Sequence, residues 1–341
     1  MRHPFALEPL AAYLRQHLPG FGGELTAQQF SGGQSNPTYL LEAGGRRWVL
    51  RRKPPGVLLP SAHAVDREYR VMAALAHSAV PVPRVHLLCE DDSVIGSAFF
   101  VMDHVEGRSF WDPSLPGMAA KQRGAIYDEM NRVIAALHGV DIHAAGLAAY
   151  GRPGQYLKRQ IERWTWQYRA SETEPIVAME SLIEWLPTHL PEADETTLVH
   201  GDFRIDNLIF HPHEPRVLAV LDWELSTLGH PLADFAYHCM TWRVTPAEFR
   251  GLKGHDLAPL GIPLENAYVQ AYCKRSGRAA LADWDYYMAF NMFRMAAILQ
   301  GILHRALHGS AASAEAEQTG RLARPIAEAG WRQVTDQHRA R

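Results

Sequence analysis

The chain has 341 residues, of which 47% are hydrophobic and 21% charged; this excludes a disordered or fibrous protein and suggests two domains. Its 34 Lys and Arg residues nearly balance 37 Asp and Glu residues, and the net charge of -3 excludes a bulk attraction to nucleic acid or to an anionic membrane. We therefore expect a globular protein that binds any anionic ligand through local groups.

The N-terminal segment begins with a helical pattern and then changes to short strands. Leucines at helical spacing predict an amphipathic helix over residues 5–18, which Pro19 and Gly20 end. Three β-type runs follow, at residues 25–30, 38–42 and 47–51. Because glycine-containing turns separate these runs, we expect three antiparallel strands.

A helix and two further strands complete the first lobe. Residues 62–77 place apolar side chains on one helical face, and the prolines at 81 and 83 end the pattern. Apolar runs at 84–89 and 98–102 predict two more strands. We expect residues 1–105 to form a β-rich lobe with the element order β-β-β-α-β-β.

Residues 106–341 are expected to form a second, mostly helical lobe. Two short apolar runs at 207–210 and 217–221 interrupt the helical patterns and predict a β-hairpin. The most apolar stretch, 288–303, contains Asn291, Arg294 and Gln300, which indicates a buried helix and not a membrane span. The Ala-, Glu- and Arg-rich segment 311–328 is expected to pack loosely.

The cysteines and the N-terminus indicate the compartment. Cys89, Cys239 and Cys273 are scattered and form no CxxC pair, which argues against a disulfide framework or a zinc knuckle. The first residues lack the apolar run of a signal peptide. We expect a soluble, cytoplasmic protein, whereas the sequence leaves its oligomeric state open.

The strongest chemical signal is the run His200-Gly201-Asp202-Phe203-Arg204-Ile205-Asp206-Asn207, followed by Asp222 at the end of the next predicted strand. An H-x-D-x-x-x-x-N loop before a strand-terminal Asp is typical of kinase-type phosphoryl transfer. Asp202 is the candidate base for the proton of an attacking hydroxyl. Asn207 and Asp222 carry the oxygen ligands that Mg²⁺ prefers. The His-Gly-Asp tripeptide alone would more often be a capped turn, so the whole pattern carries the prediction.

The first lobe offers groups for nucleotide phosphates. A glycine-rich turn between the first two strands could bring backbone N–H groups to a phosphate, although a plain hairpin turn is the alternative; its candidate residues are Ser31, Gly32, Gly33, Ser35 and Asn36. Arg51 and Lys53 share one face of the third strand, and either could reach a phosphate or simply be solvated.

Two further positions belong to this candidate nucleotide site. Glu68, on the following helix, could pair with the strand cation, or it could form an ordinary surface ion pair with a neighbour on its own helix. The backbone around Asp103 and Val105 follows an apolar strand at the lobe boundary, where it could bind an adenine edge. An ordinary linker is the alternative there.

Taken in order, these residues resemble the aminoglycoside phosphotransferase family of the protein-kinase-like fold. The resemblance runs from Phe30 to about Arg305 and rests on LVHGDFRIDNLIF and VLAVLDWELSTLGHPLADFAYH. A narrower likeness, in VLRRKPPGVLLPSAHAVDREYRVMAAL and FVMDHVEGR, is to the kinase-like domain of acyl-CoA dehydrogenase fusion proteins. It implies an α+β, two-lobed fold with a small antiparallel-sheet N-lobe and a mostly helical C-lobe.

The resemblance also implies ATP and Mg²⁺ as cofactors and transfer of the γ-phosphoryl group to an alcohol. It makes Asp202 the catalytic base and Glu68 the helix glutamate. It makes Asn207 and Asp222 the ligands of Mg²⁺, with Glu224 assisting the metal site. It places the backbone of Asp103 and Val105 on adenine and gives Asp234 a supporting role under the loop.

Two departures from the kinase pattern bear on substrate and nucleotide. Arg51 stands where such kinases carry a phosphate-binding Lys, with Lys53 two residues on. Arg supplies charge and two donors, but with a different geometry. Gly201 replaces the Arg of the protein-kinase His-Arg-Asp motif, which matches the small-molecule branch and implies that the substrate is not a protein.

Aromatic and basic residues of the second lobe are candidates for acceptor binding. The expected set is Trp164, Trp166, Tyr168, Trp284, Tyr286 and Tyr287, with Lys158, Arg159, Arg163, Arg169 and Arg294. Such a lining would favour an anionic or acyl substrate, although aromatics at helical spacing are more often core. We expect a hydroxylated small metabolite, with a hydroxyacyl thioester as one candidate, and not necessarily an aminoglycoside.

Two other functions compete with a kinase. A His- and Asp-rich region could bind Zn²⁺ or Mn²⁺ in a hydrolase, although two of its histidines flank a proline in the hairpin turn and are expected to face solvent; its residues are His200, Asp202, His211, His213, Asp222, His230 and His238. A non-catalytic nucleotide-binding protein of kinase fold is the second alternative.

Overall fold

The computed structural model describes residues 5–30, 36–54, 64–309 and 315–339. The chain forms two compact units, and it passes between them several times. The first consists of Met1–Ser109, His143–Leu147 and Asn207–Ser226, and the second of Phe110–Ile142, Ala148–Asp206 and Thr227–Arg341. From the sequence we predicted a single boundary, between residues 105 and 106, which placed the hairpin in the second lobe. In the structure the hairpin belongs to the first unit.

The first unit is built on a five-stranded antiparallel sheet. The strand order is β1-β2-β3-β5-β4, and every neighbouring pair is antiparallel. The strands are β1 (Thr26–Gln29), β2 (Thr38–Ala43), β3 (Arg46–Arg52), β4 (Val85–Cys89) and β5 (Phe99–Asp103). All five strands predicted from the sequence are therefore confirmed.

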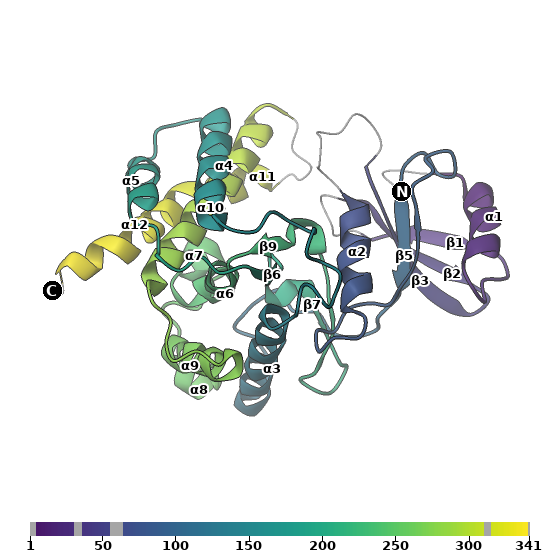
Figure 1. Cartoon of the computed structure of the whole chain (residues 1–341), viewed down its shortest axis with the longest axis horizontal. Coiled ribbons are helices and arrows are strands. Elements are labelled where there is room, and N and C mark those ends of the chain that lie inside the picture. Colours follow the sequence, from purple (N-terminus) through teal and green to yellow (C-terminus); the bar gives the residue numbers. More distant parts are fainter. Residues whose placement is uncertain (1–4, 31–35, 55–63, 310–314, 340–341) are drawn as a thin grey trace. The chain divides into compact units, whose positions relative to one another are not determined.

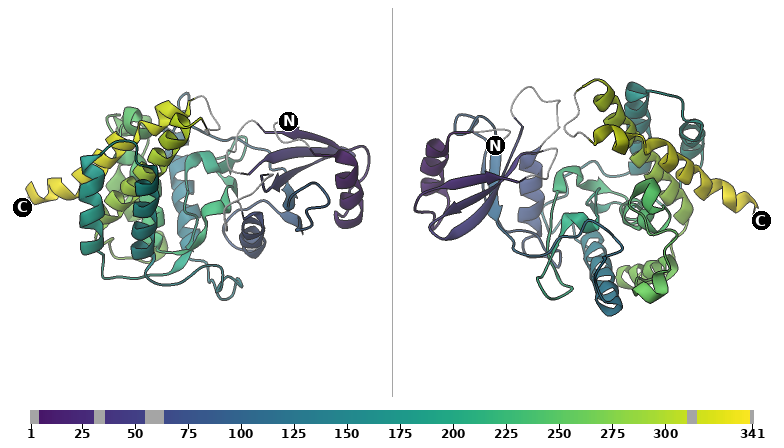
Figure 2. Two further views of the ribbon diagram at one scale, coloured as in Figure 1. Left: turned by 90° about the horizontal axis from the view of Figure 1, so that it is seen from above. Right: turned by 180° about the vertical axis from the view of Figure 1, so that it is seen from behind.

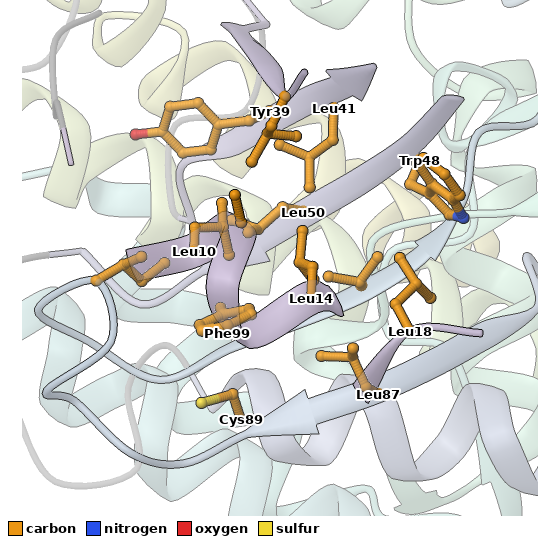
Figure 3. Packing of buried hydrophobic residues seen from close by; sticks show 14 of the residues in the cluster. Leu10, Leu14, Leu18, Tyr39, Leu41, Trp48, Leu50, Leu87, Cys89 and Phe99 are labelled. Atoms are coloured by element: carbon orange, nitrogen blue, oxygen red, sulfur yellow. The ribbon is translucent and has the colours of Figure 1, made fainter. Parts of the chain in front are cut away.

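Helix α1 (Leu7–His17) packs against one face of this sheet. Its leucines at positions 10 and 14 contact a cluster from β2, β3 and β5 that includes Tyr39, Leu50 and Phe99 (Figure 3). All five of these side chains are fully buried. The helical spacing of the leucines therefore predicted both the helix and the face that it buries.

Helix α2 (Val65–Leu75) lies on the opposite face of the sheet (Figure 1). Strand side chains alternate between faces, so Arg51 of β3 points away from the α1 side, on which Leu50 lies. On the α2 side the ring of Tyr69 meets the edge of Phe100, with centroids 6.3 Å apart. This packing places Glu68 of α2 next to Arg51.

The predicted hairpin is present as β7 (Leu208–Phe210) and β8 (Val217–Val220) and is followed by a short 3₁₀ turn at Trp223–Leu225. Two contacts attach it to the first unit. The Val220 N–H donates to the carbonyl of Pro81 at 2.9 Å, and Arg108 and Phe210 exchange two backbone hydrogen bonds of 2.8 Å. The adjoining Gly107 has no room for a side chain, since a Cβ would lie 2.3 Å from the Phe210 carbonyl oxygen.

The second unit is mostly helical and includes a two-stranded antiparallel pair, β6 (Thr197–Val199) and β9 (Thr227–Gly229). Its longer helices are α3 (Ala120–His138), α4 (Tyr156–Ser171), α5 (Val177–Trp185), α6 (Pro231–Cys239), α9 (Glu265–Ser276), α10 (Trp284–Leu307) and α12 (Ala323–Arg339). The shorter helices are α7 (Pro246–Phe249), α8 (Leu257–Leu260) and α11 (Ala316–Gly320).

Helix α10 is the core of the second unit and contacts α4, α5, α6, α11 and α12. Figures 1 and 2 show α12 lying along it. The predicted loose packing of residues 311–328 is wrong for the described part of that segment, because Ile326 and Ala327 of α12 are fully buried. Small residues such as Gly330 let α12 approach Met292 closely. No helix within the described ranges is both long and apolar enough for a membrane span.

Candidate functional site

Arg51 of β3 is surrounded by three carboxylates of the first unit. Its Nε lies 3.0 Å from the Glu68 carboxylate, and its Nη2 lies 2.6 Å from Asp222 and 3.7 Å from Glu224. Only 12% of the Arg51 side chain and 2% of the Glu68 side chain are exposed. The expected pairing of the strand cation with Glu68 is therefore formed by Arg51.

Lys53 lies on the same strand face but in a different environment. Its amine is 4.0 Å from Asp66, and about a third of each of the two side chains is exposed. Such an exposed pair contributes little stability. Arg51 is the cation that the helix glutamate holds.

Asn36 also contacts Glu68. Its Nδ2 donates to Glu68 Oε1 at 2.9 Å, and the Asn36 side chain is fully buried. The other residues of the glycine-rich turn, Ser31, Gly32, Gly33 and Ser35, lie outside the described residues. Their approach to a phosphate stays a prediction.

The group of three carboxylates around one guanidinium carries surplus negative charge. Burial raises the pKa of Glu68, Arg51 offsets this in part, and Asp222 and Glu224 add repulsion, so that the pKa is about 7. Burial works against the charge of Arg51, yet the three carboxylates raise its pKa overall. An additional cation next to Asp222 and Glu224 would relieve this repulsion.

The predicted metal ligands Asn207 and Asp222 lie at the same end of the hairpin. The Leu221 N–H donates to the Asn207 carbonyl at 2.8 Å, and Asp222 follows with a positive φ of 64° that turns the chain. Carboxylate and amide oxygens suit Mg²⁺, which usually takes few protein ligands beside phosphate and water oxygens. Within the described part of the chain, no three His, Cys, Asp or Glu side chains form a site of their own for a metal. The donor set therefore fits Mg²⁺ bound together with a nucleotide.

The predicted adenine-binding segment follows β5. The Asp103 N–H donates to the Arg84 carbonyl at 2.9 Å, and its carboxylate lies 2.6 Å from His86 Nε2. The Asp103 N–H is thus already used within the sheet. The contact of the Asp103 and Val105 backbone with adenine stays a prediction.

The second unit holds the loop that carries Asp202. The N–H groups of His200 and Gly201 each donate to the Asp234 carboxylate at 2.8 Å, and His138 Nε2 lies 3.2 Å from it. Burial works to raise the pKa of Asp234, but the hydrogen bond from His138 and the neighbouring His200 lower it overall. Gly201 has a φ of 81°, which explains why glycine stands at this position.

Asp202 itself is held by side chains of the same unit. Tyr237 donates its hydroxyl to Asp202 Oδ1 at 2.5 Å, and Arg204 Nε lies 2.9 Å from the same oxygen. Arg204 also contacts Asp206 at 3.4 Å, and Arg250 contacts Asp206 at 3.2 Å. The two arginines and the two aspartates balance each other in charge.

A pocket of the second unit lies beside this loop. Its charged lining is Arg204, Asp206 and Arg250, and the rest is mainly apolar or aromatic, including Trp111, Tyr127, Met130, Tyr237, Met240, Val244 and Phe249. The Arg250 guanidinium stacks 3.9 Å above the ring centroid of Trp111. The pocket therefore combines an apolar lining with compensated charges.

The model of the phosphotransferase enzyme family matches residues 26–287, which is most of the chain. The chain belongs to this family. A crystallised protein of Ralstonia eutropha, assigned to the aminoglycoside phosphotransferases, is 57% identical, with a TM-score of 0.90 over 98% of this chain and 99% of that one. A spectinomycin phosphotransferase bound to ADP and spectinomycin is 12% identical, with a TM-score of 0.62 over 96% and 98% of the chains, and shows the fold alone.

Curated relatives confirm the narrower resemblance. Acyl-CoA dehydrogenase family member 10 of Mus musculus is 52% identical over 91% of this chain and 29% of its own length. Family member 11 of Rattus norvegicus is 46% identical over 96% of this chain and 43% of its own length. The chain thus spans less than half of either relative. The predicted family and the α+β kinase-like fold class are confirmed.

Most aromatic residues expected to line an acceptor site are core residues instead. Trp164, Tyr168, Tyr286 and Tyr287 are buried in the helical unit, while Trp166 is 70% exposed. None of them lines the pocket beside the Asp202 loop. The pocket residues Trp111, Phe249 and Arg250 were missed because they come from separate, irregular segments with no periodic pattern.

Three basic residues of the expected acceptor set also have other contacts. Arg169 pairs with Glu180, and Arg159 donates to backbone carbonyls of Gly154 and Arg152. Arg294 is buried, and its Nη2 donates to the Gly201 carbonyl at 2.6 Å. These contacts hold the helical unit and the Asp202 loop.

The histidines that suggested a hydrolase have structural contacts. His230 Nδ1 accepts the Leu232 N–H and caps α6, and His238 Nε2 lies 2.7 Å from the Tyr268 hydroxyl. His211 Nδ1 accepts the N–H groups of residues 213 and 214 within the hairpin turn. This use of the imidazoles gives no support to a His-ligated metal centre.

Proposed function

We propose that this phosphotransferase transfers the γ-phosphoryl group of ATP to an alcohol hydroxyl of a small metabolite and requires Mg²⁺. The observation that carries this proposal is the cluster of Arg51, Glu68, Asp222 and Glu224. It presents one oriented cation for phosphates beside carboxylates whose surplus charge calls for a divalent ion. Mg²⁺, when bound, neutralises charge on the phosphates.

Each residue has a defined role in this proposal. Arg51, oriented by Glu68, binds nucleotide phosphates with its planar guanidinium. Asn207 and Asp222 hold the ion, and Glu224 adds negative charge next to it. Asp202 orients the attacking hydroxyl and accepts its proton.

The pocket beside the Asp202 loop supports an acceptor with a large apolar part. Its charged residues are already paired, so it offers no surplus carboxylate to a polycationic aminoglycoside. The curated relatives are named for acyl-CoA dehydrogenases, which act on acyl thioesters. We infer that a hydroxyacyl thioester is the acceptor class. The lack of nucleic-acid and membrane partners and the cytoplasmic location stay predictions from the sequence.

Calorimetric titration with ATP tests the nucleotide site. We expect ATP to bind the wild-type protein tightly only with Mg²⁺, and Asp222→Asn to weaken this binding by about tenfold or more, because one ionic ligand is lost. Asp66→Asn is the matched control, since it removes a carboxylate of the same unit from an exposed pair with Lys53. Equal Mg²⁺-dependent affinity in both variants would contradict the assignment of Asp222.

An acceptor series tests the substrate class. Release of ADP is measured with 3-hydroxyacyl thioesters of increasing chain length, with glycerol and with kanamycin. We expect the highest kcat/KM for a hydroxyacyl thioester, because its chain can fill the apolar pocket. A clear preference for kanamycin would contradict the acceptor class but not ATP-dependent transfer. Tight MgATP binding without transfer to any acceptor would favour the non-catalytic alternative.

A further inference from the structure

Tyr237 and Asp234 are three residues apart on α6 and therefore share one face of that helix. Asp234 accepts hydrogen bonds from the backbone of the loop that carries Asp202. Tyr237 binds the Asp202 carboxylate, with 2.5 Å between its hydroxyl and Oδ1. Helix α6 thus binds both the backbone of the loop that carries Asp202 and the side chain of Asp202, the candidate base.

Two donors bind the Asp202 carboxylate, one on each oxygen. Tyr237 donates to Oδ1, Arg204 Nη2 donates to Oδ2 at 3.3 Å, and the charged Arg204 Nε lies 2.9 Å from Oδ1. Two donors from different elements restrict rotation of the carboxylate, and a base that accepts a proton during transfer depends on such orientation.

Tyr237 is itself rigidly placed. Only 4% of it is exposed, and the Arg294 guanidinium lies 5.0 Å from the centroid of its ring. Arg294 in turn donates to the Gly201 carbonyl, next to Asp202. Burial, followed by the charge of Asp202, raises the pKa of Tyr237, so its hydroxyl keeps its proton and acts as a neutral donor.

We propose that Tyr237 is a positioning residue that orients the Asp202 carboxylate for phosphoryl transfer. This inference rests on the proposed function. The proton of the attacking hydroxyl goes to Asp202, and Tyr237 neither gains nor loses a proton in the step. The charged groups facing Asp202 in the same unit are Arg204, with Asp206 and Arg250 behind it.

The test compares Tyr237→Phe with Tyr286→Phe. Tyr286 is a similarly buried tyrosine of the core of the same unit that does not line the pocket, and its hydroxyl donates to the Leu186 carbonyl at 3.1 Å and not to Asp202. Each change removes one hydroxyl and keeps the ring. Phosphate release from MgATP, with water as the acceptor, and transfer to 3-hydroxybutyryl-N-acetylcysteamine are both measured.

We expect Tyr237→Phe to lower kcat roughly 10- to 100-fold in both assays, with KM for MgATP unchanged, because the base is misoriented while the nucleotide site is untouched. Tyr286→Phe should retain the wild-type kcat. Thermal unfolding and circular dichroism establish that both variants are folded.

Two outcomes would overturn the inference. Equal kcat values for the two variants would show that the hydrogen bond to Asp202 does not matter. A Tyr237→Phe protein that fails to fold would show that Tyr237 serves stability. A wild-type protein with neither hydrolysis nor transfer would contradict the proposed function itself, which separates that failure from the failure of the Tyr237 assignment.

Discussion

The Asp202→Asn variant should bind MgATP with nearly wild-type affinity and lose phosphoryl transfer, with kcat lower by about 10²- to 10⁴-fold. Asn keeps the size of the side chain and can still accept the hydrogen bond from Tyr237. It cannot accept a proton from an attacking hydroxyl at neutral pH. The expected loss is therefore confined to the chemical step, while Arg51, Asn207 and Asp222 continue to bind the nucleotide.

Two measurements check this expectation. Calorimetry gives the affinity for MgATP, and a coupled ADP assay gives kcat with the best acceptor of the series. Asp128→Asn is the control, because Asp128 is an exposed carboxylate paired with Arg275 away from the loop. Normal turnover by purified Asp202→Asn would rule out the proposed base.

The Asp234→Ala variant should be less stable by about 3–5 kcal/mol. The change leaves the buried N–H groups of His200 and Gly201 without their Asp234 acceptor and removes one partner of His138, which also bonds to the Tyr272 hydroxyl. Urea unfolding gives the free energy of unfolding. Glu317→Ala, which breaks an exposed helical pair with Arg321, should change it by less than about 1 kcal/mol.

The pH dependence of stability offers a second check on Asp234. Its pKa in the folded protein is below the ordinary value of 3.8, so the unfolded chain takes up the proton first as the pH falls. The contribution of Asp234 is therefore complete above the ordinary pKa and is lost as the pH falls toward the folded value. Unfolding of Asp234→Asn should depend less steeply on pH in this acidic range. Parallel pH curves for the two proteins would contradict this assignment.

Several elements could be predicted because local patterns specify them. The leucines of α1, the alternation in β2 and β3, and the proline-rich turn of the hairpin each indicate one conformation within a few residues. The His200–Asn207 motif was recognisable because the spacing of Asp202 and Asn207 is itself the chemical signal. Strand periodicity left Arg51 and Lys53 equivalent, and only the family resemblance favoured Arg51, since the packing of α2 decides which cation meets Glu68.

The remaining features depend on contacts between distant segments. The pocket joins Trp111 to Arg250 across more than a hundred residues, and neither lies in a periodic run. The contact of Tyr237 with Asp202 likewise follows from how α6 packs against the loop. The aromatic residues of α4 and α10 looked like a binding surface, but burial made most of them core.

The division of the chain among the two units limits what truncation can reveal. A fragment that stopped at Ser109 would contain Arg51 and Glu68 but would lack Asp222 and Glu224, which return to the same unit much later. Its guanidinium would keep one of its three acidic partners. Limited proteolysis or deletion is therefore expected to abolish nucleotide binding without showing which part of the sequence binds the nucleotide. Complementation between fragments would require a second piece that supplies residues 207–226.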